Sequence, residues 1–132
     1  MRRTSILLHG LFAMLIASAC SGGSTEPGTI SLSGTYSGTI NAVGFPAGTL
    51  TFTLSHAGTS VTGTWSNSLG ASGNGTGTVS GTTLTFTLSQ TSPCTGTFTG
   101  NAAIQNSGAR LSGSFSGSDC NGSGSGTFVV NR

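Results

Sequence analysis

The stretch Leu50–Ser55, with the sequence Leu-Thr-Phe-Thr-Leu-Ser, recurs unchanged at Leu84–Ser89. In both copies every second residue is a large apolar one, and the residues between are Thr or Ser. Because successive side chains of a β-strand point to opposite faces, this alternation predicts a strand with one apolar face and one hydroxyl-bearing face. The repeat therefore indicates a β-sheet protein whose interior is lined by alternate residues of each strand.

The same alternation continues from Ser33 to the end of the chain, interrupted by clusters of Gly, Ser and Asn, and no segment has a helical period. Tight Gly-rich turns predict that sequential strands pair as an antiparallel meander, and eight strands can close into a small barrel. We therefore predict an all-β domain, a closed or nearly closed barrel with strands near 33–40, 48–56, 60–67, 74–80, 82–89, 94–104, 109–116 and 123–130.

Two other arrangements fit the same periodicity. A two-sheet β-sandwich is the main alternative, because alternation does not distinguish a sandwich from a barrel. A membrane barrel with its apolar face outward is weaker, because membrane strands need about 9 to 11 residues and aromatic girdles at both ends. Here the apolar runs are shorter and the aromatic residues lie in mid-strand.

A second repeated pattern places Gly two residues before an aromatic residue, as in Gly34–Tyr36, Gly63–Trp65 and Gly113–Phe115. Residues two apart share a face, so the Gly leaves room for the ring and permits the strong coiling that closure requires. With the matching segments Gly34–Thr39 and Gly77–Thr82, the repeats indicate a three-strand unit used twice and then shortened to two. The expected interior comprises Tyr36, Ile40, Leu50, Phe52, Leu54, Val61, Trp65, Val79, Leu84, Phe86, Leu88, Phe98, Ile104, Leu111, Phe115, Phe128 and Val130.

The N-terminal segment has the organisation of an export signal. Met1–Ser5 carries two Arg, Ile6–Ile16 is mostly apolar, and Ala17–Ala19 is a run of small residues. The apolar stretch is well short of the ~20 residues that span a bilayer as a helix. We therefore predict that residues 1–19 are a signal peptide that is removed.

Cys20 follows this signal directly, and Leu15–Cys20 resembles the lipobox of bacterial lipoproteins. In that family the Cys receives a diacylglyceryl group and becomes the new N-terminus. Ala17 stands where the family prefers Leu, which leaves a secreted protein with a free Cys20 as the alternative. By the same resemblance, Ser21 in place of Asp implies the outer membrane. We expect residues 20–32 to be a lipidated Cys and flexible tether, and 33–132 to be the barrel domain.

Charge is scarce along the whole chain. Charged residues make up 5% of the sequence, against about 25% in an ordinary soluble domain. After removal of the signal, Arg110 and Arg132 balance Glu26 and Asp119, and there is no Lys. Because binding to a phosphate backbone depends on Lys and Arg that displace counterions, we expect no nucleic-acid partner.

The remaining cysteines, Cys94 and Cys120, are expected to form a disulfide in an exported protein. A metal site would need further ligands, and only His56, Asp119 and Glu26 are available, so we expect no metal and no cofactor. His56 follows a predicted strand and is interpreted as a solvated turn residue. With no second group to orient it and no pair of carboxylates across a cleft, we expect no catalytic site and no enzymatic activity.

The segment Gly63–Gly70 resembles the opening strand and turn of the avidin and streptavidin family, Gly-Thr-Trp-x-Asn-x-Leu-Gly. The resemblance implies a meander barrel of the avidin and lipocalin kind, with Asn67 at a ligand-bonding position and Leu69 lining the pocket. It covers eight residues only. Ala71 stands where the family has a hydrogen-bonding Ser, and the other Trp residues of the biotin site are missing.

The first predicted hairpin loop, Ala42–Ala47, is unusually apolar and contains Phe45. It would either plug one barrel end or contact a ligand or protein partner. Because so many aromatic residues are expected inside, we predict a filled lumen. A filled lumen favours a structural or interaction role over ligand binding, and we therefore predict a non-catalytic module of this kind, anchored by a lipid at Cys20. The alternative is binding of a small apolar ligand in the barrel mouth, by Phe45, Trp65 and Asn67.

Overall fold

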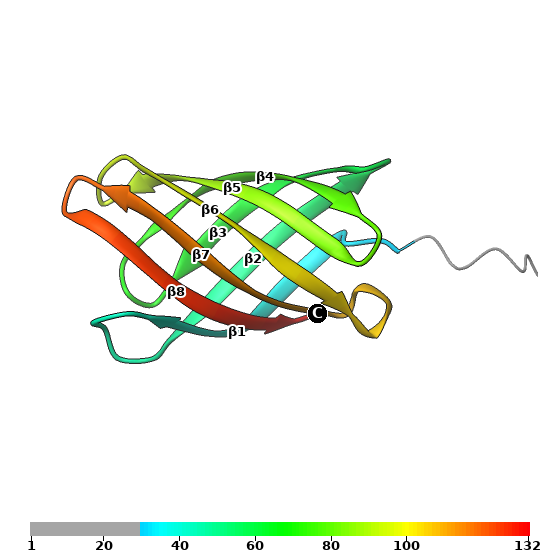
Figure 1. Ribbon diagram of the computed structural model, residues 1–132, viewed down its shortest axis with the longest axis horizontal. Helices are drawn as coiled ribbons and strands as arrows, with labels where there is room; N and C mark the ends of the chain where they lie inside the picture. The colour runs from blue at the N-terminus through cyan, green and yellow to red at the C-terminus, as the bar shows by residue number, and fades with distance from the viewer. Residues whose placement is uncertain (1–29) are drawn as a thin grey trace, which may run out of the picture.

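The computed structural model describes residues 30–132, and these form a single sheet of eight antiparallel strands (Figure 1). The expected signal peptide and the lipidation site Cys20 lie outside the described residues. The strands and one short 3-10 turn are β1 (Gly34–Ala42), β2 (Gly48–Ala57), β3 (Ser60–Asn67), β4 (Ser72–Ser80), β5 (Thr83–Ser92), β6 (Gly96–Gln105), η1 (Asn106–Gly108), β7 (Arg110–Asp119) and β8 (Gly122–Asn131).

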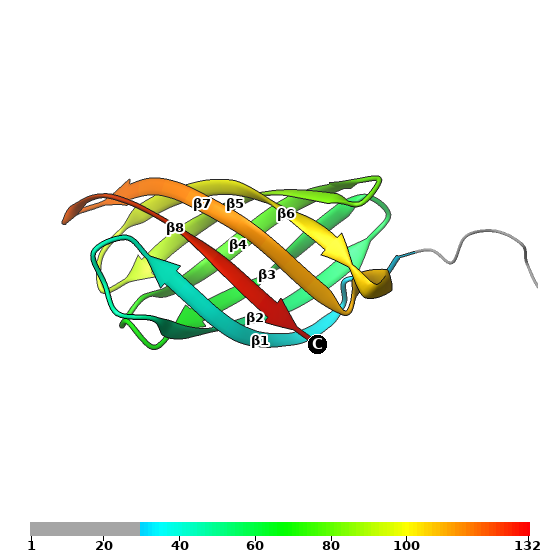
Figure 2. The same cartoon turned by 60° about the horizontal axis from the view of Figure 1, so that its bottom comes forward.

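Each strand pairs with the next along the chain, and β8 pairs with β1, so the sheet closes into a meander barrel. Figure 2 shows this closure, with β8 lying beside β1. The predicted barrel is confirmed, and the sandwich alternative is wrong. Several strands are longer than the sequence predicted, above all β5 and β7, because residues 90–92 and 117–119, which resemble turn residues, are part of the strands instead.

The interior of the barrel is apolar and its outer face carries mainly Thr and Ser. Every residue expected inside is buried or half-buried, and Phe128 packs edge-to-face against Phe52 and Phe86 with ring centroids 5.6 and 5.7 Å apart. This polarity is the reverse of a lipid-facing barrel surface. Among residues 30–132, no helix is long and apolar enough to cross a membrane.

Closure depends on glycines at inward-facing positions. A Cβ atom on Gly38 would overlap the carbonyl oxygen of Val129 on β8, and one on Gly100 would overlap that of Ser114 on β7. Neighbouring backbones approach too closely there for any side chain. The expected role of Gly in strand coiling is therefore seen at these two positions.

The two ends of the barrel differ. At one end, the closed end, lie residues 30–33, η1 and the C-terminal Arg132. At the other, the open end, lie the four loops 43–47, 68–71, 93–95 and 120–121. Leu32 is fully buried and Ile30 packs against the core, so the folded part includes residues that the sequence analysis assigned to the tether.

Candidate functional site

The closed end is sealed by the N-terminal segment. The backbone N–H of Leu32 donates to Nδ1 of His56 at 3.1 Å, and the N–H of His56 donates to the Ser33 hydroxyl at 3.0 Å. Nε2 of His56 is buried and has no partner among the described residues. The interpretation of His56 as a solvated turn residue is therefore wrong: it lies within β2 and fixes the segment that covers the barrel end.

Tyr36 and Arg132 complete the seal. The Tyr36 hydroxyl, fully buried, donates to the carbonyl of Gly108 in η1, and burial raises the pKa of this phenol while the nearby Arg132 charge lowers it. The Arg132 guanidinium lies 5.5 Å from the Tyr36 ring centroid and donates from Nη1 to the carbonyls of Ser31 and Ser33. No ligand path is expected through this end.

The open end contains a cavity of about 420 Å³. This volume lies within the range of small-molecule sites in proteins. Its wall is mostly apolar and includes six aromatic residues, and the polar residues lie near the loops. The apolar side chains that line it are Ile40, Ala42, Val43, Phe45, Leu50, Phe52, Trp65, Leu69, Ala71, Leu88, Pro93, Phe98, Phe115 and Phe128.

The lumen is therefore not filled along its whole length, and that expectation is wrong for the open half. One physical reason is Gly124, a position of β8 that lines the cavity and has no side chain. A Cβ there would touch only Phe98 Cε1, at 3.5 Å. Deeper in the barrel, Phe52, Trp65, Leu88 and Phe128 separate the cavity from an apolar void of about 30 Å³.

Phe45 does not plug the barrel. It is 64% exposed and Val43 is 74% exposed, although both line the cavity mouth. The loop is held by two backbone hydrogen bonds, from Val43 N–H to the Ser125 carbonyl and from Phe45 N–H to the Ala42 carbonyl. A fixed loop thus presents two apolar side chains at the rim.

Trp65 and Asn67 line the same cavity as Phe45. Trp65 is 6% exposed, and its indole N–H donates to the Asn74 carbonyl at 3.0 Å. Asn67 Oδ1 accepts hydrogen bonds from the N–H groups of Leu69 and Ala71, both at 3.0 Å. The Asn67 oxygen therefore shapes its own turn, and only its amide nitrogen is left for a ligand.

Gln90 and Asp119 are polar residues of the cavity that were not predicted as site residues from the sequence. Gln90 is 4% exposed, and its Nε2 donates to Asp119 Oδ2 and to the Cys94 carbonyl, both at 2.9 Å. The Gln90 and Asn121 hydrogen bonds lower the pKa of the Asp119 carboxyl. The sequence did contain a signal for Gln90. It lies an even number of residues after Leu84 and Phe86, so its side chain is on the inward face of the same strand.

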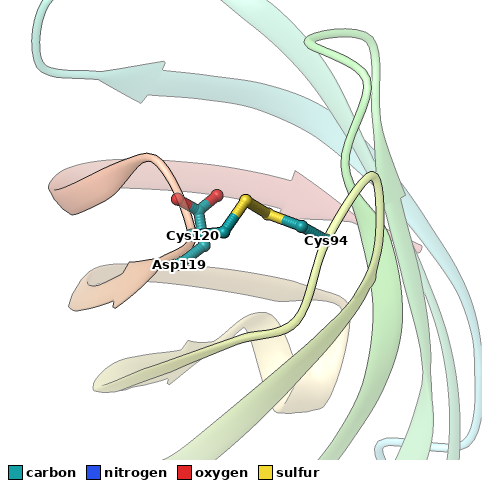
Figure 3. Close-up of side chains that lie close together, drawn as sticks. All are labelled: Cys94, Asp119 and Cys120. Carbon is teal, nitrogen blue, oxygen red and sulfur yellow. A yellow bond between two sulfur atoms is a disulfide. The ribbon is translucent and has the colours of Figure 1, made fainter.

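The predicted disulfide between Cys94 and Cys120 is confirmed, with an S–S distance of 2.06 Å. It joins the loop 93–95 to the loop 120–121 at the open end, next to Asp119 (Figure 3). Ligand atoms of these three residues lie within 4.8 Å of one another. Because both sulfur atoms are used in the disulfide, only one carboxylate of this group remains as a metal ligand.

Comparisons with known proteins support the fold. No family model and no curated protein matches the chain. Among solved structures, EF1p2_mFAP2b bound to DFHBI is similar, with a TM-score of 0.64, 15% identity, 76% of this chain covered and 93% of that chain. The redesigned β-barrel b11L5F_LGL has a TM-score of 0.58 and 15% identity, and the redesigned β-barrel mFAP1 bound to DFHBI has 0.57 and 17%. Each aligns over 76% of this chain, and they cover 90% and 94% of their own chains, respectively.

Proposed function

We propose that this protein is a non-catalytic binding module that holds a small apolar ligand in the open end of its barrel. The observation that carries the proposal is the cavity of about 420 Å³, walled by aromatic and aliphatic side chains and open beside Phe45. Burial of apolar surface stabilises a complex by about 25 cal/mol per Å² before association costs are subtracted. Two of the similar structures, EF1p2_mFAP2b and the redesigned β-barrel mFAP1, are bound to DFHBI, which supports the proposal that a barrel of this fold can hold a small molecule.

We further propose that the barrel is exported and anchored through a lipid at Cys20, most simply in the bacterial outer membrane. The described chain begins at the closed end, beside Arg132 (Figure 1). An anchor that precedes Ile30 therefore leaves the open end on the far side of the domain from its attachment point. This arrangement leaves the cavity accessible to a ligand or to a protein partner.

The cavity-filling change Gly124→Leu tests the binding proposal. There is space for a side chain at Gly124, so Leu should occupy the cavity without displacing a backbone. The neutral apolar dye Nile red is expected to bind the wild type saturably, with a change in Trp65 fluorescence, and Gly124→Leu should weaken binding at least about tenfold.

Thr99→Leu is the matched control, because it adds the same side chain to the exposed face of β6. It should bind the dye as the wild type does. Equal dye affinity in wild type and Gly124→Leu, both folded by near-UV circular dichroism, would show that the dye does not use this cavity and would contradict the proposal.

A further inference from the structure

The polar groups of the cavity are unevenly distributed. Asp119 is the only residue with a formal charge among those that line it. Within residues 30–132 the other charged side chains, Arg110 and Arg132, lie at the closed end, where they bond to Gln105 and to backbone carbonyls. No ion pair forms among the described residues, so the carboxylate at the open end has no cationic partner there.

The Asp119 carboxylate is held in one orientation. Oδ1 accepts the N–H of Asn121 at 2.8 Å, and Oδ2 accepts Nε2 of Gln90 at 2.9 Å. Both neighbours donate, so the ionised form is favoured, and the pKa of Asp119 is lowered accordingly. A fixed negative charge thus stands at the mouth of an apolar chamber.

Gln90 adds a neighbouring acceptor. Its two Nε2 hydrogens are directed to the Cys94 carbonyl and to Asp119, and both partners are acceptors, so the amide nitrogen must face them. Its Oε1 accepts no hydrogen bond from the described residues. The side of the cavity formed by Gln90 and Asp119 therefore offers acceptors to a ligand that brings donors.

The aromatic wall favours the same kind of ligand. The rings of Phe98 and Phe115 contact each other edge-to-face with centroids 6.1 Å apart, and both line the cavity with Asp119. A cation near ring faces gains about 0.5 to 2 kcal/mol from the ring quadrupole, whereas an anion gains nothing there.

We propose that the ligand is an amphipathic cation: an apolar or aromatic body that fills the chamber, with a protonated amine that bonds to Asp119. This inference rests on the proposed binding function and narrows it. Apolar molecules that carry a carboxylate, such as fatty acids and biotin, are disfavoured, because their negative charge would face the Asp119 carboxylate.

Three probes with a shared naphthalene body test the charge preference: 2-(1-naphthyl)ethylamine, 2-(1-naphthyl)ethanol and 1-naphthaleneacetate. Isothermal titration calorimetry at neutral pH and low salt should rank the amine first and the carboxylate last, with about tenfold or more between those two. Added salt should reduce this ratio and leave the alcohol unaffected.

Asp119→Asn should remove the preference, because the amine and the carboxylate would then both meet a neutral side chain, which can still accept from Gln90. Thr85→Lys is the matched control: it changes net charge by the same unit on the exposed outer face of β5, and should preserve the ranking.

The outcomes separate the two proposals. If the alcohol binds but amine and carboxylate bind equally, or if Asp119→Asn keeps the preference, the cation inference is overturned and the binding function stands. If none of the three probes binds and Nile red also fails to bind, the binding function itself is overturned, and the cation inference falls with it.

Discussion

Gln90 and Asp119 lie on strands that are not neighbours, and their side chains meet across β6 in a hydrogen bond of 2.9 Å. The residue beneath the bond is Gly96, which pairs with Gln90 on one side and with Asp119 on the other. A Cβ on Gly96 would lie 2.6 Å from the Cβ of Asp119. Because Gly96 of β6 has no side chain, Gln90 and Asp119 can form the side-chain hydrogen bond that joins β5 to β7 at the open end.

The first prediction concerns this bond and pH. Because the folded state lowers the pKa of Asp119, the carboxylate stabilises the native state above the ordinary aspartate value of about 3.9. That contribution should disappear as the pH falls through the lower native value. Urea unfolding of wild type and Asp119→Asn from pH 7 to pH 2 should show wild type more stable at neutral pH and the two converging in acid. A difference independent of pH would mean that the charge has no role.

The second prediction concerns closure of the barrel. Gly100→Ala should lower the free energy of unfolding by at least about 2 kcal/mol, because the new Cβ would overlap the backbone carbonyl of Ser114. Gly124→Ala is the control, since its Cβ would make an ordinary contact with Phe98 at 3.5 Å. Denaturant midpoints compare the two, and equal losses would contradict the steric argument.

Much of this architecture follows from period-two alternation. It predicted all eight strands and the inward residues, because each strand buries one face, and the tight turns predicted the meander order. Closure was predicted from the number of strands, since the alternation alone also fits a sandwich. The disulfide followed from cysteine number and export. These features depend on local pattern, which the sequence contains directly.

The cavity and its polar groups did not follow. Inward aromatic rings fill a lumen only where no inward glycine leaves space beside them. Which residues lie beside one another inside the barrel depends on the register of all eight strand pairs, and this cannot be read from one strand at a time. His56 was misplaced for a related reason: its partner Leu32 is distant in sequence and looked like part of a polar tether. Gln90 was missed because a polar residue near a strand end resembles the start of a turn.

The third prediction concerns the anchor. Wild-type protein expressed in a Gram-negative bacterium should incorporate a fatty-acid analogue, and Cys20→Ala should abolish labelling, because the Cys thiol is the acylation site in lipoproteins that carry a lipobox. Cys94→Ser/Cys120→Ser is the control: it removes the disulfide but should retain the label. Absence of label in the wild type would favour a secreted protein with a free Cys20.

The last prediction separates the rim from the core by comparing two phenylalanines. Phe128 is 3% exposed and contacts two aromatic rings, so Phe128→Ala should cost about 3 to 5 kcal/mol of unfolding free energy. Phe45 is 64% exposed, so its truncation should cost less than about 1 kcal/mol. Because Phe45 lines the mouth, however, Phe45→Ala should weaken Nile red binding several-fold. Thermal unfolding and dye titration measure the two effects independently. A large stability loss in Phe45→Ala, with unchanged dye affinity, would restore the interpretation of this loop as a plug.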